Sequence, residues 1–150
     1  MDVLAIAMSI FALLEVSNVA LLYFQASSRL GNGVGVFNAY EKSKSDPEMH
    51  EFVRYLVNWV AGTKLIFILL LGVIIVTGSD VTKTWSAIVL VLSIGTYFWR
   101  LHPIIRQMDM EQRITPIGYS RTLGIMIASF MSIFAISLIV THGSVIFHVG

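Results

Sequence analysis

Four stretches of the chain are almost entirely apolar, and polar segments separate them. They occupy about residues 3–24, 48–77, 85–102 and 116–141. Because an α-helix rises about 1.5 Å per residue, roughly 20 apolar residues cross the hydrocarbon core of a bilayer. The pattern predicts an all-α integral membrane protein, a four-helix antiparallel bundle that forms a single domain.

Helix-start signals place two of these helices more closely. Residues 45–48 read Ser-Asp-Pro-Glu, which supplies a side-chain cap, a proline for the first turn and an acidic residue. Residues 115–116 read Thr-Pro, and they predict the start of the fourth helix in the same way. The second helix is expected to end at Gly78. The connection to the third helix is then short, and we expect the two to form a tight hairpin.

The first long connection, residues 25–47, contains glycines at alternate positions. Gly31, Gly33 and Gly35 lack the lysine and the strand–loop–helix context of a phosphate-binding loop. We therefore interpret the segment as a flexible turn. Apolar side chains at helical spacing across residues 34–40 predict a short amphipathic helix on the membrane surface.

The second long connection, residues 103–115, is polar and charged. A surface helix is expected over residues 106–113. Asp109 and Glu111 lie next to arginines there, and we expect solvated carboxylates that pair with these neighbours.

Basic residues predict the orientation of the chain in the membrane. Eight of them belong to the two long connections and the adjoining helix ends, whereas Lys83 alone lies at the opposite side. Short loops rich in lysine and arginine remain in the cytoplasm. We expect both termini outside a cell or inner membrane, and a first helix that is retained because it lacks a basic start. The eight residues are Arg29, Lys42, Lys44, Arg54, Arg100, Arg106, Arg113 and Arg121.

Polar side chains inside the apolar stretches are the candidate functional residues. Glu15 and Lys64 carry opposite charges within the first and second helices, where a charge costs several kcal/mol unless it is satisfied. Counting from the aromatic and basic residues at the boundary puts both, with two serines, roughly 8–13 Å into the membrane. Two asparagines and a tyrosine lie closer to the cytoplasm. The predicted ligand- or ion-binding set is Glu15, Asn18, Asn58, Lys64, Ser93, Tyr97 and Ser129.

Three interpretations of this set remain open. The carboxylate and the ammonium group can exchange protons with a passing ion, as such residues do along transport paths. The pair can instead join two helices structurally, with the serines and asparagines bonding across them. In the third interpretation, the Lys64 side chain extends toward the headgroups near Trp59 without a partner.

Composition narrows the function classes. The chain contains no cysteine, which excludes disulfides and thiolate chemistry, and a net charge of +1 gives no case for nucleic-acid binding. The histidines fall at helix ends, so we expect no metal and no cofactor, and no histidine is placed to activate a serine.

Two function classes fit these observations best. The first is a small ion- or proton-coupled transporter or channel, and the alternative is a non-catalytic membrane anchor or regulatory subunit. A lipid-modifying enzyme is the least favoured class. The expected partners are the lipid bilayer and either further copies of the chain or another membrane protein, because four helices enclose little interior.

Overall fold

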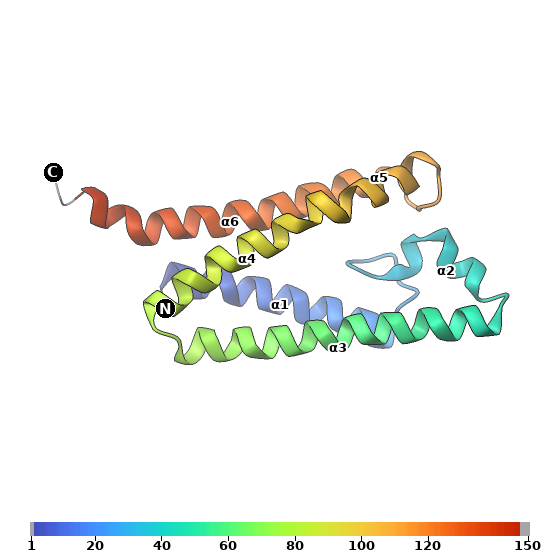
Figure 1. Ribbon diagram of the computed structural model, residues 1–150, viewed down its shortest axis with the longest axis horizontal. Coiled ribbons are helices and arrows are strands. Elements are labelled where there is room, and N and C mark those ends of the chain that lie inside the picture. The colour runs from blue at the N-terminus through green and yellow to red at the C-terminus, as the bar shows by residue number, and fades with distance from the viewer. Residues whose placement is uncertain (1, 148–150) are drawn as a thin grey trace.

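The computed structural model describes residues 2–147, with side chains to residue 143. Within this range every regular element is helical (Figure 1). Four helices, α1, α3, α4 and α6, are long and apolar enough to cross a membrane. This confirms the all-α class and indicates a membrane protein. The elements are α1 (Val3–Phe24), η1 (Val34–Val36), α2 (Asn38–Ser43), α3 (Pro47–Thr77), α4 (Asp80–Arg100), α5 (His102–Met110) and α6 (Tyr119–Phe147).

Local capping explains the bounds of the two middle helices. α3 begins at Pro47, and the Asp46 carboxylate accepts a hydrogen bond from the Met49 backbone N–H at 3.2 Å. α4 begins at Asp80, five residues before the expected start at 85, because the Ser79 hydroxyl accepts from the Thr82 N–H at 3.2 Å. A polar first turn therefore extends the third helix beyond its apolar stretch.

A carboxylate from α5, not the Thr-Pro pair at 115–116, caps the start of α6, which begins only at Tyr119. Asp109 accepts from the N–H groups of Gly118 at 2.9 Å and Ser120 at 3.0 Å, and from the Ser120 hydroxyl at 2.6 Å. The expectation that Asp109 is a solvated loop carboxylate is therefore wrong. Its charge is buried, and it satisfies N–H groups that a helix start would otherwise leave unpaired.

The surface helix of the second connection lies earlier than expected. α5 ends at Met110, and Gln112 adopts a positive φ of 56° just beyond it. Glu111 and Arg113 form the expected pair of neighbours, with an oxygen–nitrogen distance of 2.7 Å at the exposed surface.

The long helices form two pairs, and the pairs meet where α6 contacts α1. α3 packs along α1, and α4 packs against α6, which also contacts α1. The expected tight hairpin between α3 and α4 is wrong, because these helices diverge from their connection and contact each other little (Figure 1). The ends of α1 and α6 that lie nearest the termini are at the same end of the molecule as this connection (Figure 1).

The hydrophobic core is continuous at that end and divided at the other. Near the α3–α4 connection, one cluster joins all four long helices through side chains such as Met8, Leu71, Leu90 and Phe134. Farther along, a second cluster joins α1 and α3, with Ala26 and Val34 of the first long connection packed against it. A third joins α4 and α5 to the long connections and to the first turns of α6. The helix pairs thus separate toward the end that carries the two long connections.

Candidate functional site

The centre of the site is an ion pair between α1 and α3. The Lys64 ammonium nitrogen lies 2.6 Å from Glu15 Oε2. The Glu15 side chain keeps 14% of its surface exposed and the Lys64 side chain keeps 28%. Because Lys64 has a partner, the interpretation in which it extends to the headgroups alone does not describe this structure. The pair is partly open, which distinguishes it from an ion pair sealed in a core.

Asn18 extends the pair by one turn of α1. Its Nδ2 donates to Glu15 Oε1 at 3.3 Å, because residues three apart share a helix face. Its Oδ1 accepts a hydrogen bond from the backbone N–H of Asn32 at 3.3 Å. A continuous polar chain therefore runs from Lys64 through Glu15 and Asn18 to the first long connection.

Residues 25–37, which we call the inner loop, enter the space between the two helix pairs from the end that carries the long connections (Figure 1). Figure 1 shows this loop folding back from the end of α1, with its tip between α1 and α4. The Val34 N–H donates to the Ala26 carbonyl at 2.9 Å, and the Gly35 N–H donates to the Ser28 carbonyl at 3.2 Å. A Cβ at Gly33 or Gly35 would collide with the loop's own backbone carbonyls.

Gly31 lies against the Asn18 side chain of the ion-pair chain. It adopts φ +54°, and a Cβ there would lie 2.5 Å from Asn18 Oδ1. Only glycine fits both the backbone angle and the space. The glycines expected in a flexible turn instead allow a compact loop that sits against Asn18.

Hydrogen bonds attach the inner loop to the second long connection. The Thr115 N–H donates to the Val36 carbonyl at 2.8 Å, and the Asn38 N–H donates to the Arg113 carbonyl at 3.0 Å. Val36 is fully buried in the cluster that contains Tyr97, Ile105 and Ile114. The two connections thus form one cover over this end of the molecule.

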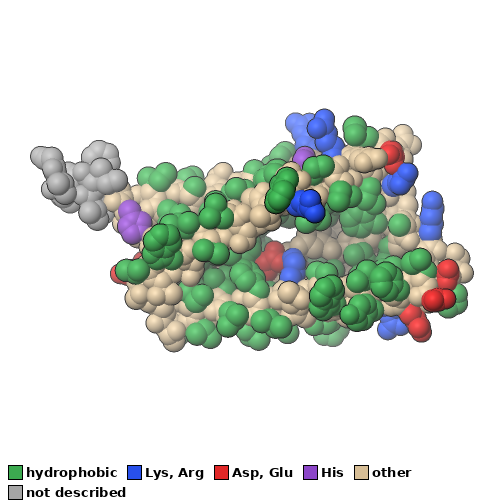
Figure 2. All heavy atoms as spheres, in the orientation of Figure 1, with side chains coloured by type: hydrophobic (Ala, Val, Ile, Leu, Met, Phe, Trp, Pro, Cys, Tyr) green, Lys and Arg blue, Asp and Glu red, His purple; other side chains and the backbone are tan. Residues whose placement is uncertain are grey.

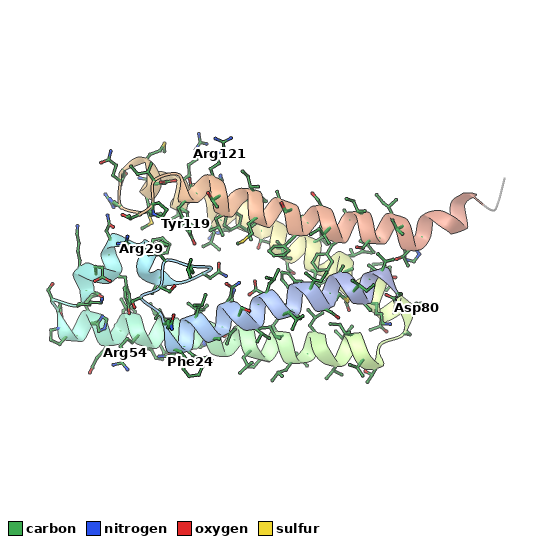
Figure 3. The ribbon with its side chains drawn as sticks, turned by 180° about the vertical axis from the view of Figure 1, so that it is seen from behind. Phe24, Arg29, Arg54, Asp80, Tyr119 and Arg121 are labelled. Carbon is green, nitrogen blue, oxygen red and sulfur yellow. The ribbon has the colours of Figure 1, made fainter. Side chains whose placement is uncertain are left out.

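Tyr119 connects the loop tip to α6. Its hydroxyl donates to the Gly31 carbonyl at 3.3 Å, and Figure 3 shows Tyr119 at the start of α6 on the side that faces the loop. The loop tip is therefore held from α1 by Asn18 and from α6 by Tyr119.

The other four candidate residues do not reach the ion pair. Asn58 donates to the Arg54 carbonyl of its own helix at 2.9 Å. Ser129 donates to the Ile125 carbonyl at 2.9 Å, again within one helix. Each side chain is thus satisfied by its own helix and not by α1.

Ser93 and Tyr97, both on α4, lie in two different surroundings. Ser93 lines an apolar groove of about 400 Å³ between α3 and α4. Tyr97 is buried, and its hydroxyl lies 3.3 Å from His102 Nδ1. The structure therefore brings together Glu15, Asn18 and Lys64 and leaves the remaining candidates apart.

The surface around the site is hollowed. Figure 2 shows an opening between α3 and α4, with acidic and basic side chains lying next to each other at its edge in otherwise hydrophobic surroundings. Lys64 also borders an apolar groove of about 360 Å³ along α3. At the loop end, a cavity of about 380 Å³ lies between the end of α1, α2 and α3, and Tyr23, His50, Arg54 and Asn58 contribute to its lining.

Sequence reasoning missed the connection between the ion pair and the inner loop. A carboxylate beside an ammonium group can take its proton, which turns the charged pair into a neutral pair with no net gain or loss of protons. Within residues 2–147 no cluster of three or more histidine or acidic side chains could hold a metal ion. The Asn32 N–H is a backbone group, so no pattern of residue types indicates its bond to Asn18.

Comparisons with known proteins leave this geometry as the basis for assigning function. No protein-family model, curated protein or solved structure matches the chain.

Proposed function

We propose that this chain is a small membrane protein that conducts or transports protons, alone or coupled to an ion, through the site at Glu15 and Lys64. The observation that carries the proposal is the partly open ion pair, 2.6 Å long, in the apolar interior of two candidate membrane spans. Charged groups at such depth are costly, and those that face an opening are typical of ion and proton paths.

The inner loop is the proposed closure of this path. It lies between the helix pairs, and its Asn32 N–H bonds to Asn18, which also bonds to Glu15. Protonation of Glu15 would weaken the charge-assisted bonds to Lys64 and Asn18, because a neutral carboxyl group is a poorer acceptor. The loop would then lose part of its attachment to α1, which couples proton binding to opening.

Charge distribution supports a cytoplasmic position for the loop end. Figure 2 shows basic side chains concentrated toward the end that carries α2 and α5. At the other end, Lys83 is paired with Asp2 at 3.0 Å, so little free positive charge is left there. By the positive-inside rule we propose a four-helix antiparallel bundle in the cell or inner membrane with both termini outside.

A second copy of the chain is the proposed partner that completes the path. Four helices enclose little interior, and the groove between α3 and α4 is apolar and open. Phe67, Leu70, Trp85 and Val89 supply much of its lining. A helix from a second protomer that fills this groove would also cover the opening beside the ion pair.

The alternative is a membrane anchor or regulatory subunit in which the ion pair only joins helices. The satisfied polar network favours it, since within the described residues no buried side-chain nitrogen or oxygen lacks a hydrogen-bond partner. Mass measurement of the intact assembly in lipid separates the two candidates. The transporter should appear as a homo-oligomer, whereas the subunit should carry a different protein.

Proton flux in liposomes tests the proposal. With a pH gradient and an enclosed pH-sensitive dye, the wild type should dissipate the gradient faster than empty liposomes. Glu15→Gln keeps the size of the side chain and removes its charge, so it should abolish the excess flux while the protein stays folded. Ser132→Ala is the control, because the Ser132 hydroxyl bonds only within α6. Equal flux from the wild type and Glu15→Gln would overturn the proposal.

A further inference from the structure

A second charged site lies on the outer surface where α4, α5 and α6 meet. Arg106 and Arg121 line one groove of about 380 Å³ together with His102. Neither arginine forms an ion pair with any carboxylate of the described residues. Figure 2 shows basic side chains next to a histidine over the start of α6. The groove therefore presents positive charge that the chain itself does not neutralise.

Neighbouring polar groups do not offset this charge. Ser120 also lines the groove, but its hydroxyl already donates to the buried Asp109 carboxylate. His102 Nδ1 faces the Tyr97 hydroxyl at 3.3 Å, which leaves Nε2 as the ring nitrogen available to a ligand. No acidic residue is among those that line the groove. An anion is thus the ligand that the charges favour.

The rest of the groove is apolar and continues onto the membrane-facing surface. Phe98 from α4 and Ile125 and Ala128 from α6 form its walls on the side away from the arginines. Figure 3 shows Arg121 on the outer side of α6, directed away from the inner loop. The groove is therefore basic where α4 ends in Trp99 and Arg100, residue types that mark the headgroup level, and apolar along the membrane spans.

We propose that this groove binds an anionic phospholipid, with its phosphate between Arg106 and Arg121 and the first part of an acyl chain along Phe98, Ile125 and Ala128. Guanidinium groups match phosphate oxygens in charge and in planar geometry. Basic grooves between membrane helices at the cytoplasmic side recognise lipid headgroups in this way. The site is separate from Glu15 and Lys64, and it stands whether or not the protein transports protons.

Lipid retention tests the site. The protein is released from nanodiscs made of phosphatidylcholine and phosphatidylglycerol in equal amounts, and its bound lipids are identified by native mass spectrometry. The wild type should retain phosphatidylglycerol in preference. The double variant Arg106→Gln/Arg121→Gln should bind it about 30-fold more weakly, roughly fivefold for each arginine. The double variant Arg29→Gln/Arg113→Gln removes the same charge outside the groove and should behave as the wild type.

A further variant separates a lipid from a free anion. Ala128→Trp fills the apolar end and keeps both arginines, so it should weaken phosphatidylglycerol retention and leave any binding of inorganic phosphate unchanged. Because Ala128→Trp leaves both arginines in place, its loss of phosphatidylglycerol is a second test that does not depend on the folding of Arg106→Gln/Arg121→Gln. Equal losses in the two double variants would overturn the proposal, as would no loss in either. Stabilisation by inorganic phosphate equal to that by phosphatidylglycerol, with no effect of Ala128→Trp, would assign the site to a soluble anion and also overturn it.

Discussion

At the scale of single residues, Glu15 and Lys64 place two charges inside apolar helices, which costs free energy. Moving either charge into an apolar surrounding is unfavourable, and the short contact and the Asn18 amide offset part of that cost. Each residue therefore depends on the other more than a surface pair would.

A double-mutant cycle measures this dependence. Lys64→Met leaves Glu15 without its partner and should lower the free energy of unfolding in bicelles by on the order of 3–5 kcal/mol near neutral pH. The loss should shrink at low pH, because Glu15 can then become neutral. Glu15→Leu combined with Lys64→Met should recover much of the stability.

The matched control is an exposed ion pair of the same type. Lys44 lies 2.8 Å from Glu41 at the surface, and Lys44→Met should cost less than about 1 kcal/mol. If the Glu15/Lys64 double variant loses the sum of the two single losses, the residues do not stabilise each other.

Asp2 gives the fold a defined pH dependence at the start of α1. Its pKa is lowered from the usual value by the hydrogen bond from the Ala5 backbone N–H and then by the Lys83 ammonium group. A carboxylate with a lowered pKa contributes stability above its unfolded pKa, and that stability is lost as the pH falls through its folded pKa. Asp2→Asn should therefore destabilise the protein near neutral pH, and the difference from the wild type should shrink as the pH falls from the usual pKa of aspartate through the lowered pKa of Asp2.

The control for Asp2 is Asp80→Asn, at the exposed start of α4 on the same end (Figure 3). It should not reproduce the loss, because none of the ion pairs among the described residues includes the Asp80 carboxylate. Thermal melting in nanodiscs at a series of pH values gives the comparison. A difference between Asp2→Asn and the wild type that grows toward low pH would contradict the assignment.

Residue types predicted which polar side chains lie inside the apolar stretches, but not the direction in which each one points around its helix. Glu15 and Lys64 could be paired because they are the two opposite charges well inside the apolar stretches. Ser93 and Ser129 were assigned the same depth, yet each successive residue turns about 100° around the axis. Ser93 lines the groove between α3 and α4, and Ser129 bonds to the Ile125 carbonyl of its own helix, so neither side chain reaches the ion pair.

At the scale of elements, the inner loop owes its compact shape to its glycines. Gly31 has a positive φ and approaches Asn18, and Gly33 and Gly35 lie against the carbonyls of Ser28 and Ser27. These contacts come from tertiary packing, so the alternating glycines alone indicated only a turn. A loop held this closely can act as a closure, which a mobile turn cannot.

Gly31→Ala tests that role. The added methyl group would meet Asn18 Oδ1, and alanine at φ +54° is strained by roughly 1 kcal/mol. We expect the Asn32 N–H to lose its bond and amide exchange across residues 25–37 to accelerate. Gly72→Ala is the control, because a Cβ there meets nothing within 4 Å. Unchanged exchange in the inner loop of Gly31→Ala would show that the contact with Asn18 does not hold it.

The start of α6 illustrates where element prediction failed. Thr-Pro at 115–116 is a common helix-start signal, but Asp109 supplies the cap from a different helix. The sequence separation of nine to eleven residues hides such a cap from local patterns. The apolar stretch of the same helix was recognisable because it needs only composition and length.

At the scale of the whole molecule, the proposed orientation follows from charge and can be checked with single cysteines, since the chain has none. Cysteine at the exposed Glu51 should be protected from an impermeant thiol reagent in intact cells, and cysteine at the exposed Val81 should react. Lysis should make both reactive. Labelling of Glu51→Cys in intact cells would show that the chain has the opposite orientation.

Modification of Glu15 by an apolar carbodiimide tests the central claim most directly. The reagent dissolves in the bilayer and reacts with protonated carboxyl groups, and peptide mass spectrometry reports the modified residue. An open, proton-exchanging Glu15 should be modified in reconstituted wild type, more strongly as the pH falls, and more strongly still in Lys64→Met. A water-soluble carbodiimide that modifies the exposed Glu51 confirms the mapping. Glu15 that stays unmodified at every pH, in the wild type and in Lys64→Met, would contradict the account.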